Sequence, residues 1–147
     1  MHIVVNDANI LMDLADLDML DFLSSLEYDY HTTDFVIAEI DDEHQKFKID
    51  IFINNEKLSV KSFTDAEFSS IVDFSALHSG LSITDCSVLY YSMETKGVLL
   101  TGDGKLRKIA NDSQLEVRGI LFLFDQLVDK KVITPETAYR KLMILCE

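Results

Sequence analysis

Four acidic residues stand where the chain is expected to leave a strand or enter a helix: Asp7, Glu39, Asp85 and Asp103. Asp7 follows the apolar run at 3–5, and Asp103 follows a second apolar run that ends at Leu100. Carboxylates that gather at one edge of a sheet repel one another unless a divalent cation lies between them. Carboxylate oxygens are ligands for Mg²⁺ or Mn²⁺, and such cations support the hydrolysis of phosphodiester bonds.

Apolar strand candidates alternate with longer helical stretches, which is the pattern of an α/β domain around a parallel sheet. We expect strands near 2–6, 28–33, 57–63, 97–101 and 115–118. We expect helices within 8–26, from Asp34 through Phe47, from Thr64 onward, and over 82–95, 104–110, 120–131 and 135–146. No linker or repeat interrupts the 147 residues, so the prediction is a single domain, 1–147.

In a parallel sheet every strand ends at the same edge, and the following helices begin there. Asp7 and Asp103 come directly after the first and fourth strands, and Asp85 begins the helix before the fourth strand. Glu39 lies about a turn and a half into the helix after the second strand. Each acid has a simpler explanation alone, because Asp7 and Asp103 suit N-caps and Asp85 can close a capping box with Ser82. Together, however, the four acids predict one metal site.

Four segments, at 4–11, 36–40, 83–88 and 99–106, resemble the PIN-domain family in their order and approximate spacing. The sharpest parts of the resemblance are the Asp-x-Asn element at 7–9 and the Thr-x-Asp element at 101–103. The resemblance covers nearly the whole chain. It implies a Rossmann-like, three-layer α/β fold with a central parallel sheet of four to five strands in the order 3-2-1-4-5, flanked by helices.

The resemblance also implies a function, since PIN domains are metal-dependent ribonucleases and many are VapC-like toxins of toxin–antitoxin pairs. It implies RNA as substrate, Mg²⁺ or Mn²⁺ as cofactor, and an antitoxin and a second copy of the chain as partners. The catalytic and metal-binding set is then Asp7, Glu39, Asp85 and Asp103, with Asn9 and Thr101 beside it as polar support. The basic residues Lys105, Arg107 and Lys108 follow the last aspartate and are expected to hold the RNA backbone; alternatively, they form a solvated helix face.

Two departures leave alternatives open. Many toxin-type members carry a further acid shortly after the last aspartate, whereas 104–108 holds none, so one or two cations are compatible with the sequence. The alternative function is a catalytically weak or inactive PIN-like module that binds nucleic acid or protein. The helical ligand is also open, because Asp42 and Glu43 lie three and four residues after Glu39, near the same face.

The composition of the chain bears on which functional classes of protein are compatible with it. The chain has 13 Lys and Arg against 26 Asp and Glu, a net charge of −13, which argues against promiscuous RNA binding and favours a narrow substrate or a basic partner. No apolar run reaches about 18 residues, and the N-terminus lacks a basic region, so we expect a cytoplasmic protein without a membrane span. The two cysteines and four histidines show no disulfide or zinc spacing.

Two other aspartate-based folds match poorly. A phosphoacceptor receiver domain needs two adjacent acids after the first strand, where Asn6-Asp7 supplies one. A haloacid-dehalogenase-type phosphatase needs an Asp-x-Asp element, and position 9 is Asn.

Overall fold

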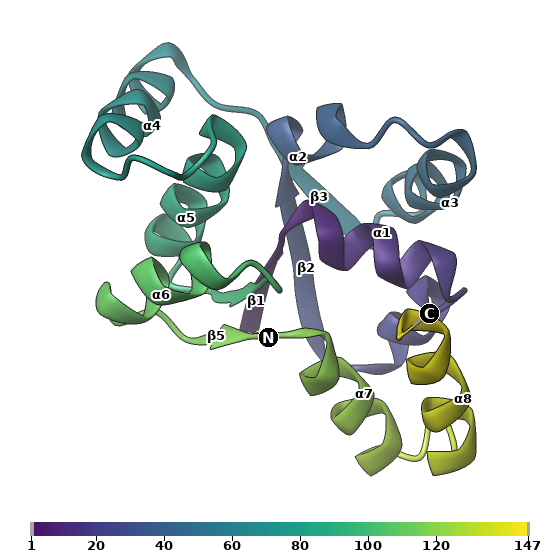
Figure 1. Cartoon of the computed structure of the whole chain (residues 1–147). Coiled ribbons are helices and arrows are strands. Elements are labelled where there is room, and N and C mark those ends of the chain that lie inside the picture. Colours follow the sequence, from purple (N-terminus) through teal and green to yellow (C-terminus); the bar gives the residue numbers. More distant parts are fainter. Residues whose placement is uncertain (1, 147) are drawn as a thin grey trace.

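The computed structural model describes residues 2–146 (Figure 1). They form three layers, a five-stranded sheet between two layers of helices. The strands are β1 (His2–Asn6), β2 (Tyr28–Thr33), β3 (Leu58–Lys61), β4 (Val98–Leu100) and β5 (Val117–Arg118). Their order is β3-β2-β1-β4-β5, and every neighbouring pair is parallel. The predicted α/β class, the parallel sheet and the order 3-2-1-4-5 are therefore confirmed.

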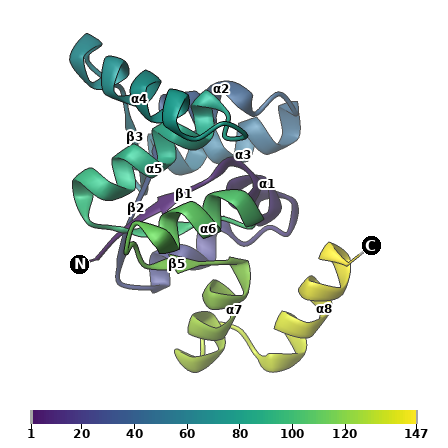
Figure 2. The same cartoon turned by 60° about the vertical axis from the view of Figure 1, so that its left-hand side comes forward.

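Helices cover both faces of the sheet. They are α1 (Ala8–Asp16), the 3₁₀ helix η1 (Leu20–Ser25), α2 (Asp34–Glu39), α3 (Glu43–Asn54), α4 (Asp65–Leu77), α5 (Ile83–Thr95), α6 (Gly104–Asp112), α7 (Ile120–Asp129) and α8 (Pro135–Leu145). Figure 2 shows α7 and α8 projecting from the body as a pair, with α8 outermost. Among residues 2–146, no helix combines the length and the apolar character that crossing a membrane requires.

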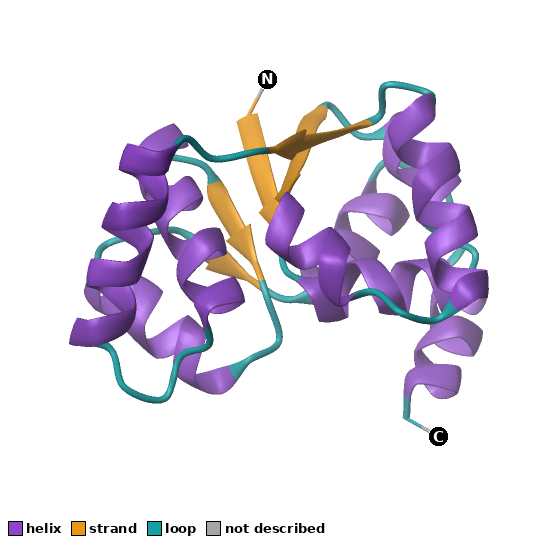
Figure 3. Ribbon diagram, turned by 90° about the horizontal axis from the view of Figure 1, so that it is seen from above, coloured by secondary structure: helices purple, strands orange, loops and turns teal. Residues whose placement is uncertain are grey.

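The two helical layers differ in how they contact the sheet. Helix α5 packs directly on β1, β2 and β4, and α4 and α6 pack on α5. Helices α1 and α3 pack together, with η1 against α3 and α7 against η1. Figure 3 shows the strands between these two groups of helices. The central strands β1 and β4 are consequently buried on both sides, which explains their continuous apolar runs.

The expected single helix from Asp34 through Phe47 is wrong, because the chain forms two helices with a break between them. Ile40 adopts an extended backbone and buries its side chain to 3 % exposure. Asp42 then starts α3 as its N-cap, with its side chain accepting from the Gln45 amide at 2.9 Å. The burial of Ile40 and the cap formed by Asp42 thus stabilise the break more than the hydrogen bonds of a continuous helix would. As a result Glu39 is the last residue of α2.

Candidate metal and active site

Asp7 links the first strand to the first helix and is the most buried of the four predicted acids. It is 5 % exposed, and its backbone amide pairs with the Leu100 carbonyl of β4 at 3.0 Å. Its Oδ1 accepts from the Ala8 amide at 2.8 Å, which makes Asp7 the N-cap of α1. The end of a buried strand and the start of a helix therefore fix this carboxylate at the carboxyl edge of the sheet.

Thr101 joins two of the acids through one hydroxyl group. Its Oγ1 donates to Asp7 Oδ2 at 2.6 Å and accepts from the Asp103 backbone amide at 3.1 Å. Thr101 is fully buried. The Thr-x-Asp element thus places a threonine hydroxyl between the carboxylate of one strand end and the backbone of the next.

Asp103 and Asp85 both start helices, as the simpler interpretation of each residue expects. Asp103 Oδ1 accepts from the amides of Lys105 and Leu106 at 2.9 and 3.1 Å, which caps α6. Asp85 forms a capping box with Ser82: Asp85 Oδ2 accepts from the Ser82 amide, and the Ser82 hydroxyl accepts from the Asp85 amide. Each of these caps uses one carboxylate oxygen, so the second oxygen of each aspartate takes no part in capping.

The charges of Asp85 and Asp103 act on the buried Asp7 carboxylate. Burial is the largest cause that raises the pKa of Asp7, and the charges of Asp85 and Asp103 raise it further. The hydrogen bonds from Thr101 and Ala8 act in the opposite direction and lower the pKa. The ion pairs among residues 2–146 involve none of these three acids. A buried carboxylate thus faces two like charges without a neutralising side chain.

Glu39, the fourth predicted acid, is exposed at the end of α2. Glu43, the alternative ligand, begins α3 and is also exposed. Asn9 is exposed in the first turn of α1. The structure therefore places Asp7 within the electrostatic reach of Asp85 and Asp103, and the roles of Glu39 and Asn9 stay predictions.

The three aspartates are the right type of ligand for a hard divalent cation, but they do not form a complete coordination site. The three aspartates supply carboxylate oxygens only, the ligand type that Mg²⁺ and Mn²⁺ prefer, and they carry an uncompensated negative charge. Across residues 2–146, however, no three His, Cys, Asp or Glu side chains come close enough together to hold a cation as they stand. The three carboxylates would therefore have to move closer together before they could share a cation. The four-acid metal site stays a prediction.

The three basic residues after Asp103 differ in their surroundings. Arg107 is half-buried, and its Nη1 donates to the Thr101 carbonyl at 3.0 Å, which ties α6 to the end of β4. Lys105 and Lys108 are exposed, and the Lys105 side chain extends toward Gly80. The side chains of Lys105 and Lys108 are thus accessible to a phosphate group. Arg107 instead has a structural partner, the Thr101 carbonyl, that the sequence did not indicate.

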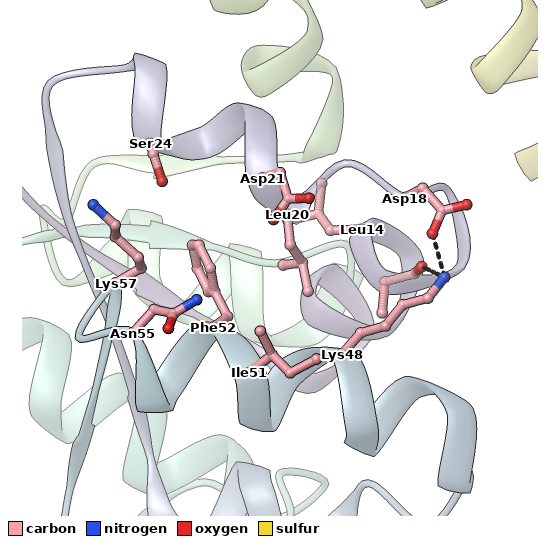
Figure 4. A pocket seen from close by; sticks show the side chains of 11 residues that line it. Leu14, Asp18, Leu20, Asp21, Ser24, Lys48, Ile51, Phe52, Asn55 and Lys57 are labelled. Carbon is pink, nitrogen blue, oxygen red and sulfur yellow. Dashed lines mark hydrogen bonds and ion pairs between the residues drawn. The ribbon is translucent and has the colours of Figure 1, made fainter.

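A cleft of about 280 Å³ lies elsewhere, between the end of α1, η1 and α3 (Figure 4). Apolar side chains such as Leu14, Leu20 and Phe52 line it, and Lys48 at one end pairs with Asp18. None of the four predicted acids is among the residues that line this cleft. The candidate site is therefore a feature of the sheet edge.

Sequence reasoning missed a set of buried hydroxyl groups beneath this edge. Thr33 at the end of β2 lies 2.9 Å from Ser87 of α5, oxygen to oxygen, and Ser87 donates to the Thr84 carbonyl at 2.7 Å. All three residues are buried. A serine or threonine in a helix gives little signal of such a role, although the polar Thr32-Thr33 pair at the end of a strand is unusual for a buried position.

Comparisons with known proteins agree with the fold. A family model described as a PIN domain matches residues 3–144. Similar solved structures include VapBC-1 from nontypeable Haemophilus influenzae, with a TM-score of 0.55 and 12 % identity over 81 % of this chain and 98 % of that chain. PAE2754 from Pyrobaculum aerophilum gives a TM-score of 0.58 and 15 % identity over 88 % of this chain and 97 % of that chain.

A third similar structure is VapBC2 from Rickettsia felis, bound to a DNA fragment from the promoter. It gives a TM-score of 0.54 and 18 % identity over 80 % of this chain and 98 % of that chain. At these identities the likeness is one of fold. No curated protein matches the sequence.

Proposed function

Because the chain belongs to the PIN-domain family, we propose that it is a metal-dependent endoribonuclease that hydrolyses RNA phosphodiester bonds at the edge defined by Asp7, Asp85 and Asp103. The observation that carries this proposal is the buried Asp7 carboxylate, which faces two like charges from other elements without an ion-pair partner. Such an arrangement is unfavourable alone and becomes favourable when a cation is bound. Glu39 is included as a fourth ligand on the strength of the family pattern.

Each residue has a distinct part in this proposal. Asp7 is the fixed ligand, because Thr101 and the start of α1 hold both of its oxygens in place. Asp85 and Asp103 complete the donor set through the oxygens that their caps leave unused. A bound Mg²⁺ or Mn²⁺ would supply activation of a water molecule and stabilisation of the leaving oxygen. Lys105 and Lys108 bind the RNA phosphates, which the otherwise acidic surface would repel.

The decisive experiment is cleavage of a panel of tRNA, rRNA fragments and mRNA in Mg²⁺ or Mn²⁺, combined with calorimetric titration of Mn²⁺. Asp7→Asn and Asp103→Asn should abolish both cutting and binding, as should EDTA. Asp112→Asn is the matched control, since it removes a carboxylate from the other end of α6. A wild type that neither cuts RNA nor binds Mn²⁺ would refute the proposal.

A second candidate function is a PIN-like module that binds RNA or protein without cutting. The segment 104–108, which contains no acid, and the absence of a preformed group of three metal ligands within residues 2–146 favour it. RNA binding by gel shift without cleavage in either metal, unchanged by Asp7→Asn, would support this function over the nuclease.

We also propose that the chain is the toxin half of a toxin–antitoxin pair, acting on cytoplasmic RNA as a homodimer. Two of the similar structures are VapBC proteins, and the net charge of −13 suits a basic partner. Helix α4 offers a surface for such a partner, because it carries three acids, no basic residue and the exposed Phe68 and Val72. Co-expression with the neighbouring reading frame, followed by purification and sedimentation, tests the partner and the dimer together.

A further inference from the structure

Two polar contacts join helix α5 to strand β2. Thr33 Oγ1 lies 2.9 Å from Ser87 Oγ, and His31 Nδ1 lies 2.7 Å from the Tyr91 hydroxyl oxygen. Thr33 and Ser87 are both fully buried, with 0 % exposure. Because α5 also carries Asp85 in its first turn, these contacts bear on where that carboxylate stands.

The direction of the Thr33–Ser87 bond follows from counting protons. The Ser87 hydroxyl has one proton, which it donates to the Thr84 carbonyl at 2.7 Å. Thr33 must therefore donate to Ser87, while its own oxygen accepts from the Val36 amide at 3.2 Å as the N-cap of α2. One continuous chain of hydrogen bonds thus runs from the start of α2 to the first turn of α5.

The second ring nitrogen of His31 has a carboxylate nearby. Asp29 Oδ2 lies 3.0 Å from His31 Nε2 without the geometry of a hydrogen bond, and its charge favours a hydrogen on that nitrogen. In the neutral ring His31 Nδ1 then accepts the Tyr91 proton, and in the charged ring it donates to the Tyr91 oxygen. The bond between strand and helix exists in both states, and the half-buried rings of His31 and Tyr91 also lie in contact, 5.7 Å apart between centroids.

The spacing of the two contacts matches along both elements. His31 and Thr33 are two residues apart on a strand, which corresponds to about 6.6 Å. Ser87 and Tyr91 are four residues apart on a helix, which corresponds to about 6 Å. His31 pairs with the later helix residue, so strand and helix run in opposite directions and both contacts form in one register. A shift of α5 by one residue, about 1.5 Å, would break both.

We propose that Ser87 and Tyr91 are positioning residues, which lock the register of α5 on β2 and so set the height of Asp85 relative to Asp7. This inference rests on the proposed function, because the distance between these carboxylates matters when they share a cation. Apolar packing alone allows a helix to slide by small steps, whereas two hydrogen bonds at matched spacing allow one register only. The pair Ser87 and Tyr91 therefore affects the metal site without contacting it.

Helix α5 supplies its own matched control. Ser87→Ala/Tyr91→Phe removes two hydroxyls that reach β2. Ser92→Ala/Tyr90→Phe also removes one serine and one tyrosine hydroxyl from α5. Ser92 is as buried as Ser87 but donates to the Val88 carbonyl of its own helix, and the Tyr90 ring packs on Phe63 and Phe74. Calorimetric titration of Mn²⁺ into each apo protein gives a readout that does not depend on activity.

We expect Ser87→Ala/Tyr91→Phe to weaken Mn²⁺ binding by about tenfold or more, in the range known for residues that orient metal ligands, and the control to weaken it by less than about threefold. Equal Mn²⁺ affinities in the two double variants would overturn the positioning role while leaving the nuclease proposal intact. A wild type that binds no Mn²⁺ would refute both. If Ser87→Ala/Tyr91→Phe does not fold, Tyr91→Phe against Tyr90→Phe makes the same comparison.

Discussion

Replacing Thr101 by Val removes the hydroxyl that joins Asp7 and Asp103 while keeping the shape of the side chain. Asp7 Oδ2 loses a charge-assisted hydrogen bond of 2.6 Å, and the Asp103 amide loses its acceptor. A hydrogen bond to a charged group contributes about 1.5–3 kcal/mol, and a buried polar group left unpaired costs about 1–3 kcal/mol. Allowing for overlap between these contributions, we expect a loss of roughly 2–4 kcal/mol in the free energy of unfolding at pH 7.

The loss should depend on pH in a definite direction. The pKa of Asp7 is raised by folding, so its contribution favours the folded state below the ordinary value of 3.8 and is lost as the pH rises through the folded pKa. The Thr101 bond opposes this rise by stabilising the charged form. Without it the folded pKa climbs further, so the difference in stability between Thr101→Val and wild type should grow from pH 4 to pH 7.

Urea unfolding at the two pH values measures this difference directly. Thr32→Val is the matched control, because Thr32 is equally buried and donates to the uncharged Asn6 carbonyl at 2.8 Å. Its effect should be smaller and nearly independent of pH, and Thr101→Ser should restore much of the stability that Thr101→Val loses. If Thr101→Val and Thr32→Val destabilise equally at both pH values, the Asp7 carboxylate does not depend on Thr101 for its charged form.

Three further substitutions test the electrostatics and packing of the same edge. Asp7→Asn should leave the apo protein as stable at pH 7 as wild type, or more stable by about 1 kcal/mol, since it removes a buried charge that faces two others; thermal unfolding in EDTA measures this. Asp103→Ser should change stability by less than about 1 kcal/mol, because serine also caps helices, but should abolish Mn²⁺ binding in calorimetry. Gly119→Ala places a Cβ 3.0 Å from Arg107 Nη1 and should cost up to about 2 kcal/mol in urea unfolding unless Arg107→Ala is also present, in which case the added methyl should be tolerated.

The sheet and most helix starts could be predicted because their signals are local. Buried parallel strands are continuous apolar runs, as in β1 and β4, and the helix starts at Thr64 and Ser82 carry complete capping boxes in the sequence. Three of the four acids were placed for the same reason, since each stands at the end of a strand or the start of a helix. The prediction that they converge on one site rests on the parallel topology, because no contact between them is visible in the sequence.

Glu39 and the polar contacts of α5 lie beyond local reasoning. Whether the chain continues as one helix after Glu39 depends on the burial of Ile40, which is a property of the assembled core. Thr33 and Ser87 are 54 residues apart, and their contact exists only in one register of α5 on β2. No sequence pattern around a helical serine or a threonine at the end of a strand indicates such a distant partner.

Capping and metal binding looked like competing explanations for each aspartate, but the geometry makes them compatible. A carboxylate has two oxygens and about four acceptor sites. Asp103 satisfies two backbone amides through Oδ1 alone, and Asp85 satisfies one through Oδ2. Capping therefore anchors each side chain by one oxygen at the start of a rigid helix and leaves the other for a ligand. Under the proposed function, therefore, Asp85 and Asp103 can keep their caps and still offer an oxygen to a shared cation.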